Sequence, residues 1–320
     1  MAAAATAAAA ASAAAAASAR AVVRVLSRHV LPARLRRLRA QLRFRVADTA
    51  LVLENVSDAL NAAACLRTAD ALGIQRVHIV SRYVSAKLLA PGQTQVDRGA
   101  LKWLSVTHHE HAQACVDALR AERFLVCATD LGAGAVDAAA AARATLAMAA
   151  PAPPAPPPAP TPMPPPPTLA AQSAASGMAA EAGRPRPAQA LRPRCAVVLG
   201  NESRGVSRLL LAAADARFFL PQAGFTQSLN VSVACALALS AFLHRTPDYA
   251  PRALAAHRLR VDGAAADAAP PAPAPPETAV PGVEGLSDDD VELVLAKTLL
   301  RDVPSAAAIL DREGVRPLDF

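Results

Sequence analysis

The chain has 320 residues, a formal net charge of +7 and only 3% aromatic residues. Its five cysteines form no CxxC pair and lie in apolar surroundings, which argues against a disulfide scaffold and against a zinc finger. Its apolar segments are too short or too weakly hydrophobic to span a membrane. The positive charge suits a polyanionic partner, although a generally basic surface would give the same number.

Residues 1–31 have the composition of a targeting segment. Met1–Ala19 is alanine with a few serines and threonines, and arginines then follow at helical spacing among valines and leucines. No acidic residue precedes Asp48. This pattern is typical of transit peptides, so the segment is predicted to be disordered and to direct the chain to a chloroplast or a mitochondrion. The alternative is a low-complexity tail on a cytoplasmic protein.

Residues 32–46 predict a basic amphipathic helix. Leucines lie on one face and arginines cover the rest. Arginine side chains bind phosphate backbones without reading sequence, so the helix is a candidate to contact RNA. A solvated helix that packs on the domain through its leucines is the alternative. The arginines predicted to bind RNA are Arg36, Arg37, Arg39 and Arg43.

Alternating strands and helices define the main domain, residues 47–247. The series of elements begins with a parallel βαβ unit. It predicts an α/β fold with an open parallel sheet and helices on both faces. Gly73 is expected to cap the first helix of this unit. The predicted elements of its first half are strands at 49–56, 77–80, near 104–106 and at 124–129, and helices at 61–72 and 112–121.

Three histidines, His108, His109 and His111, follow the third of these strands. As metal ligands they would need a carboxylate partner in the right geometry. Glu110 is adjacent, but no helix face brings all four side chains together. The sequence therefore predicts a solvated helix start and no metal site.

Two alanine- and proline-rich stretches interrupt the globular pattern. An insert at about 133–192 and a linker at 248–285 are predicted to be flexible low-complexity segments. The insert falls between two strands, so it is expected to loop out and to be dispensable for folding. Residues 286–320 are predicted to form a C-terminal helical segment that opens at Ser287.

The stretch 195–243 carries two polar loops at strand ends. An apolar strand at 195–199 ends in the turn Gly200–Gly205, and a short strand at 218–220 ends at Pro221. Residues 228–230 then open a long apolar helix at 231–243. Ligands bind at the carboxyl ends of strands in open α/β sheets, so the two loops are expected to share one site.

Three motifs occur in a fixed order along the chain. The first comprises Leu51–Val56, Asn61 and Arg67–Gly73, and the later ones comprise Gly200–Glu202, Leu220–Pro221 and Ser228–Ala234. Together they resemble the motifs of the SpoU/TrmH (SPOUT) RNA 2'-O-methyltransferases. The resemblance implies a SPOUT-type open sheet with a C-terminal trefoil knot that holds S-adenosylmethionine, an RNA substrate and a homodimer.

The resemblance also assigns roles to residues. It implies that Arg67 is catalytic, with Glu202 expected to orient it. An arginine holds its proton too tightly to be an easy base, so a base and an electrostatic clamp both stay open as its role. The implied catalytic residues are Arg67, Asn61, Glu202 and Asn230, and the implied donor-binding residues are Thr129, Gly200, Leu220, Ser228 and Leu229.

Several alternatives stay open. The wording of the third motif and the basic helix favour the tRNA branch of the family, which methylates guanosine 18 of the D-loop, and ribosomal RNA is the runner-up. A noncatalytic RNA-binding protein of the same fold would be expected to lack Arg67, Glu202 or Asn230. A Rossmann enzyme would need a GxGxxG turn, to which Gly132–Gly134 is the nearest match. The apolar helix at 231–243 favours a dimer, because a partner would cover its outer side.

Overall fold

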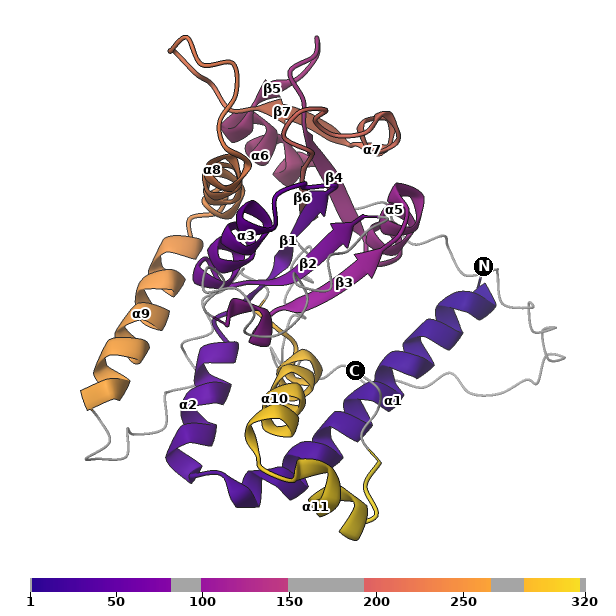
Figure 1. The fold of residues 1–320 in the computed structure, drawn as a ribbon, viewed down its shortest axis with the longest axis vertical. Coiled ribbons are helices and arrows are strands. Elements are labelled where there is room, and N and C mark those ends of the chain that lie inside the picture. The colour runs from indigo at the N-terminus through magenta and orange to yellow at the C-terminus, as the bar shows by residue number, and fades with distance from the viewer. Residues whose placement is uncertain (1, 82–98, 149–192, 266–284, 317–320) are drawn as a thin grey trace, which may run out of the picture.

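The computed structural model describes residues 2–81, 99–148, 193–265 and 285–316. Seven parallel strands form one sheet in the order β3-β2-β1-β6-β4-β7-β5, which confirms the predicted α/β fold with a parallel sheet (Figure 1). The strands are β1 (Val46–Glu54), β2 (Ile74–Val80), β3 (Ser105–His109), β4 (Phe124–Thr129), β5 (Val136–Asp137), β6 (Arg194–Leu199) and β7 (Ala216–Phe219).

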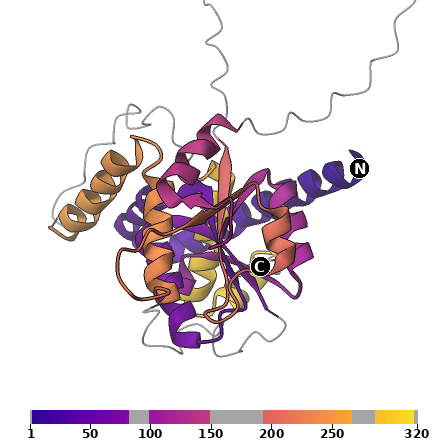
Figure 2. The same cartoon turned by 90° about the horizontal axis from the view of Figure 1, so that it is seen from above.

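Helices cover both faces of this sheet. Side chains alternate along a strand, so Leu51 and Leu53 of β1 pack into the cluster on one face and Val52 packs into the cluster on the other. Figure 2 looks along the sheet from above and places α8 and α7 on opposite sides of the strands. The first face carries α3 (Ala59–Ala71), α6 (Ala138–Ala147) and α8 (Val231–Leu243), and the second carries α5 (Ala112–Ala121) and α7 (Arg208–Ala213).

Four helices from the two ends of the chain form a separate helical unit below the sheet in Figure 1. They bury a hydrophobic core of their own, with Val22, Leu26, Leu295 and Leu310 at 0% exposure. The turn η1 (Ser27–His29) joins the first two helices. The helices of the unit are α1 (Ala2–Leu26), α2 (Pro32–Leu42), α10 (Asp288–Asp302) and α11 (Ala306–Arg312).

The predicted disorder of residues 1–31 is therefore wrong for the described residues. The alanine-rich composition suggested disorder, but the valines and leucines after Ala19 recur at helical spacing. They form an apolar stripe that α10 and α11 cover. The basic helix predicted at 32–46 is confirmed as α2, which ends at Leu42. The C-terminal helical segment is confirmed as well, with the Ser287 hydroxyl accepting from the Asp290 amide at 3.1 Å.

Parts of the two supposed low-complexity stretches are also ordered elements. The insert predicted at about 133–192 begins with β5 and α6, whose small side chains Ala141 and Ala142 pack into the core. The linker predicted at 248–285 begins with α9 (Tyr249–Ala265), where the Tyr249 hydroxyl donates to the Leu72 carbonyl at 3.0 Å. The small side chains of α6 let its backbone approach the core closely, so the helix buries surface without large side chains. The rest of both stretches, 149–192 and 266–284, lies outside the described residues.

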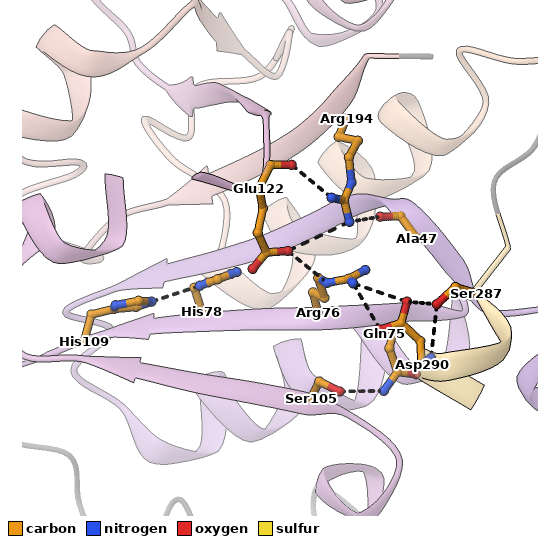
Figure 3. Close-up of polar contacts among 10 residues, drawn as sticks. All are labelled: Ala47, Gln75, Arg76, His78, Ser105, His109, Glu122, Arg194, Ser287 and Asp290. Carbon is orange, nitrogen blue, oxygen red and sulfur yellow. Dashed lines mark hydrogen bonds and ion pairs between the residues drawn. The ribbon is translucent and has the colours of Figure 1, made fainter. Parts of the chain in front are cut away.

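Arg76 joins the sheet to the helical unit. Its guanidinium lies 3.2 Å from Glu122 and 3.3 Å from Asp290 in the first turn of α10, as Figure 3 shows. A bridge between Val46 and Gly285 makes a second connection at the start of β1. The helical unit is thus attached at the amino ends of the strands, which leaves their carboxyl ends free.

His109 is buried as the last residue of β3, whereas His108 and His111 are exposed, so the predicted solvated helix start is wrong for His109. The η2 turn (Ala100–Lys102) precedes β3.

Within the described residues, none of the helices combines the length and apolar character that crossing a membrane requires.

Candidate active site

The carboxyl ends of four adjacent strands, β1, β6, β4 and β7, bring the sequence motifs together. Asn55 follows β1 with a left-handed φ of 50°, and Gly200 follows β6. Thr129 ends β4, and Leu220 follows β7. Since parallel strands end at the same edge, residues that are up to 165 positions apart in the sequence share one neighbourhood, as expected.

The loop after β6 is rigid because it folds back on itself. The Asn201 and Gly205 amides donate to each other's carbonyl oxygens at 3.0 and 2.8 Å. A Cβ at Gly200 would lie 2.1 Å from the Gly205 carbonyl carbon, so only glycine fits. The Asn201 side chain accepts from the Ser203 and Arg204 amides and donates to the Asn55 carbonyl at 2.8 Å. The loop is thereby fastened to the end of β1.

A hydrogen-bonded chain of side chains links the three motifs. The Asn61 amide at the start of α3 donates to the Glu202 carboxylate at 3.1 Å. The Asn230 side-chain Nδ2 donates to Asn61 Oδ1 at 3.1 Å, while Asn230 Oδ1 caps α8 by accepting from the Ser232 backbone amide at 2.9 Å. Three of the four implied catalytic residues therefore meet, one from each motif.

Glu202 is held in its ionised form. Its carboxylate accepts from the Ser57 amide at 3.1 Å and from the Ser57 hydroxyl at 2.8 Å. Partial burial acts to raise the pKa of Glu202, but the hydrogen bonds from Asn61, its own loop backbone and Ser57 outweigh burial and lower the pKa to about 2. The carboxylate is a fixed negative charge that positions its neighbours.

Arg67 stands apart from this network. Its side chain is exposed and has no hydrogen bond or ion pair within the part of the chain that the structure describes. Glu202 makes no hydrogen bond or ion pair with Arg67 among the described residues of this chain, because its carboxylate binds Ser57 and Asn61. The expectation that Glu202 orients Arg67 stays a prediction. Asp70, a possible ion-pair partner of Arg67, binds Arg45 at 2.6 Å instead. Arg67 thus presents a guanidinium to solvent about 9 Å along α3 from Asn61.

The residues expected to hold the methyl donor line the ends of β4 and β7. The Thr129 hydroxyl donates to the Val198 carbonyl at 3.2 Å, so it braces β4 against β6. Leu220 and Leu229 are half-buried, and the polar loop 221–228 between them, which includes Ser228, is exposed. Half-buried apolar side chains beside an exposed polar loop suit a ligand with a flat apolar ring and a polar sugar. The residues present therefore fit an adenosyl group.

Comparison with known protein families agrees with this geometry. The model of the SpoU rRNA Methylase family matches residues 48–149 and 169–240, which include all three motifs. The chain belongs to the SpoU methylase family.

Individual relatives are tRNA-modifying enzymes by name. A tRNA (guanosine(18)-2'-O)-methyltransferase of Borreliella burgdorferi is 23% identical over 69% of this chain and 78% of its own length. The Thermus thermophilus enzyme of the same name is 29% identical over 65% of this chain and 80% of its own length. The A. aeolicus TrmH/SpoU tRNA modifying enzyme has a structure that covers 85% of this chain at a TM-score of 0.51 and 20% identity, and 98% of that structure is covered. This likeness establishes that the two share a fold.

The basic helix of this SpoU family member is less free than its sequence predicts. Arg39 and Arg43 form ion pairs with Glu292 and Asp288 of α10. Arg37 donates to the Arg260 carbonyl at 3.2 Å. Arg36 is exposed and has no such interaction among the described residues, so α2 is both a packing helix and a source of free positive charge.

Sequence reasoning missed Ser57, whose position explains the stability of the site. Ser57 precedes Asp58, and Asp58 takes the capping role at α3 by accepting from the Leu60 amide at 2.8 Å. The Ser57 hydroxyl is then free to bind Glu202, 145 residues away. The Asp58 cap is readable from the sequence, but the long-range partner of Ser57 is not. A similar long-range contact joins the Glu54 carboxylate to the Ser207 amide at 2.7 Å.

Proposed function

We propose that this SpoU family member transfers a methyl group from S-adenosylmethionine to a ribose 2'-hydroxyl of RNA, with guanosine 18 of tRNA as the substrate. The observation that carries the proposal is the chain of hydrogen bonds from Asn230 through Asn61 to Glu202. It fixes the loops of all three motifs beside the strand ends that fit the donor.

The donor would be held by the ends of β4, β6 and β7. The half-buried Leu220 and Leu229 would supply apolar contacts to the adenine ring, and the exposed Ser228 would supply a hydrogen-bonding group to the polar part. Gly200 contributes indirectly, because it lets the Gly205 backbone close the loop. When bound, S-adenosylmethionine supplies an electrophilic methyl group.

The chain's own residues prepare the 2'-hydroxyl. The exposed Arg67 guanidinium binds a phosphate or stabilises the alkoxide that develops as the hydroxyl loses its proton. Asn61, Glu202 and Asn230 act as positioning residues that keep the loops in place. No metal ion and no covalent enzyme intermediate is needed for these roles.

The tRNA substrate is favoured by the names of the relatives, which specify guanosine 18 of tRNA. Ribosomal RNA is the second candidate, since the family description names rRNA. Incubation of the protein with labelled S-adenosylmethionine and tRNA transcripts tests the proposal. We expect label on a tRNA with guanosine 18 and none on a tRNA with another base at that position. Label on rRNA fragments alone would favour the second candidate, and label on neither RNA would contradict the activity.

We also propose that the chain acts as a homodimer with a shared site. Val233 and Leu237, one turn apart on α8, are 47% and 48% exposed, and Leu60 at the start of α3 is 56% exposed. Neighbouring exposed apolar side chains on otherwise well-buried helices favour a surface that a protein partner covers. The position of Arg67 away from the Asn61–Glu202 network suits a role toward the donor bound by a second copy.

Mixing two defective chains tests the shared site. An Arg67→Ala chain and an Asn230→Ala chain are each expected to be inactive, and their heterodimers are expected to recover part of the activity. A monomeric mass at micromolar concentration would contradict the dimer. A dimer without complementation would contradict only the sharing of the site.

We further propose the trefoil knot of the family and an organellar location. The sheet order, in which β6 lies between β1 and β4, supports a knotted path in the second half of the domain. The acid-free arginine-rich start of the chain supports targeting. Ala16 is the first buried residue among those whose burial the structure describes, residues 13 onward, so a cleavage that preserves this part of the helical core would lie before it. Imaging of a fluorescent fusion and N-terminal sequencing of the mature protein test the location and the cleavage point.

A further inference from the structure

Two histidines and a cysteine meet on the face of the sheet that α5 covers. His78 lies on β2, His109 ends the edge strand β3, and Cys115 lies near the start of α5. Their exposures are 3%, 8% and 0%. One ligand atom of each residue lies within 4.8 Å of the other two. Strands β2 and β3 carry none of the candidate active-site residues, so this cluster is a separate feature of the molecule.

The two imidazoles are positioned by each other. His78 Nδ1 and His109 Nε2 are 2.9 Å apart and the rings are nearly parallel, with an interplanar angle of 14° (Figure 3). A hydrogen-bonded histidine pair in a core would account for this part alone.

The cysteine makes the cluster more than a histidine pair. Within the described residues, the Cys115 thiol makes no hydrogen bond, although it lies beside two ring nitrogens. Cysteine binds a metal ion as the thiolate, so a bound cation would replace the proton of the Cys115 thiol. Three ligand atoms of the kinds that bind zinc thus converge on one buried point.

We propose that His78, His109 and Cys115 bind a divalent transition-metal ion of the zinc class. Two imidazole nitrogens and one thiolate select zinc-like ions over magnesium and calcium, which prefer oxygen. Tetrahedral geometry with Zn–N near 2.0–2.1 Å and Zn–S near 2.3 Å separates the ligand atoms by roughly 3.3–3.7 Å. The two histidine nitrogens are 2.9 Å apart, and the ligand atoms of all three residues lie within 4.8 Å of one another. Side-chain movements of about 1 Å would bring these separations to the tetrahedral values. Binding releases the Cys115 thiol proton to solvent, and the proton in the His78–His109 hydrogen bond moves to the other nitrogen of its ring, so that both ligating nitrogens have a lone pair.

The ion would act as a brace and not as a participant in methyl transfer. It would fasten the edge strand β3 to β2 and to α5, and a water molecule would complete its coordination. An edge strand has a neighbour on one side only, so a metal cross-link stabilises it where strand pairing cannot. This role predicts that the metal raises thermal stability without being required for donor binding.

Cobalt substitution tests the proposal directly on the full-length, tag-free protein after chelator treatment. Addition of Co²⁺ should give one ion per chain and a thiolate-to-cobalt charge-transfer absorption band, and Zn²⁺ should displace it. Calorimetry with Zn²⁺ should show one site, and Zn²⁺ should raise the melting temperature. Absence of the cobalt band in the wild-type protein would overturn the proposal without the need for any variant.

Variants identify the ligands. Cys115→Ser should abolish the band and weaken Zn²⁺ binding by at least about 100-fold, because even groups that only support a ligand contribute about 10–100-fold. His109→Gln provides a second ligand variant if Cys115→Ser does not fold. His111→Ala, an exposed neighbour, and Cys127→Ser, a buried thiol on β4, are matched controls that should bind as the wild type does. A band that survives Cys115→Ser, or that disappears in Cys127→Ser, would overturn the assignment.

Discussion

The helical unit and the carboxyl edge of the sheet are stabilised by opposite kinds of interaction. The helical unit buries leucines and valines and surrounds them with ion pairs such as Arg34–Asp302. The edge consists of asparagine, serine, glutamate and glycine, joined by hydrogen bonds in exposed loops. Burial of a leucine contributes about 1.5–3 kcal/mol, whereas a hydrogen bond contributes a net of about 1 kcal/mol. Stability is therefore concentrated in one region and chemistry in the other.

The largest expected effect separates chemistry from stability. Arg67→Ala should lower kcat by about 10²–10³-fold, the usual loss for one group that stabilises developing charge. Donor affinity and melting temperature should stay near wild type, because Arg67 is exposed and lies outside the hydrogen-bonded network. Arg143→Ala, an exposed arginine on α6, is the matched control. Turnover near the wild-type rate in Arg67→Ala would refute the catalytic role.

The converse experiment targets the helical unit. Leu26→Ala removes a fully buried side chain on α1 and should lower the free energy of unfolding by about 2–5 kcal/mol, measured by chemical denaturation. Leu31→Ala, which is 76% exposed, should change it by less than about 0.5 kcal/mol. Equal stability of the two variants would mean that the helical core does not hold α1. The helical unit would then not be the more stable of the two regions.

A milder effect is expected at Glu202. The Glu202→Gln variant keeps the shape of the side chain but weakens the hydrogen bonds from Ser57 and Asn61, and we expect kcat/KM to fall about tenfold. Because the folded pKa of about 2 lies below the ordinary 4.5, the stabilisation by Glu202 is complete above pH 4.5 and is lost as the pH falls toward 2.

Hydrogen exchange of the 200–205 loop measures this dependence. The wild-type loop should lose protection across the acid window, and the Glu202→Gln loop should lack that component. Glu110→Gln, an exposed carboxylate elsewhere, serves as the control and should behave as the wild type does. Loss of protection between pH 5 and 7 in the wild type would contradict the assigned pKa.

The smallest effects concern the basic helix. Arg36→Ala should weaken RNA binding about two- to fivefold and reduce the slope of log affinity against log salt by about 0.9, the value for one phosphate contact. Arg43→Ala should have less effect, because Asp288 already neutralises this charge at 3.1 Å. Filter binding at several salt concentrations distinguishes the two. Equal losses of slope would mean that RNA displaces Asp288.

The sheet and its loops were predictable from the sequence because each carries a local signal. The strands at 49–56 and 195–199 are apolar on both faces, as central parallel strands must be. The loop glycines and asparagines stand directly after these strands. The residues Asn61, Glu202 and Asn230 were expected to share a site, and the structure brings them into contact.

The missed elements carry a weaker signal. The apolar stripe of α1 follows a long alanine run, the buried residues of α6 are mostly alanines, and those of α9 are Tyr249 and Arg252. Their burial therefore depends on partners elsewhere in the chain. The ion pairs of Arg39 and Arg43 have the same cause, because their acidic partners lie about 250 positions away. Local patterns predict which elements form, whereas the pairing of distant surfaces decides which charges stay free.

The two halves of the helical core are made far apart in time. Val22 and Leu26 are translated about 270 residues before the residues that cover them, such as Leu295 and Leu310. At about 5–20 residues per second this interval lasts on the order of tens of seconds, during which α1 has an uncovered apolar stripe. The sheet domain can fold in that time, and closure of the helical core then completes folding. A nascent chain of this protein is therefore expected to bind a chaperone through α1 until α10 and α11 are translated.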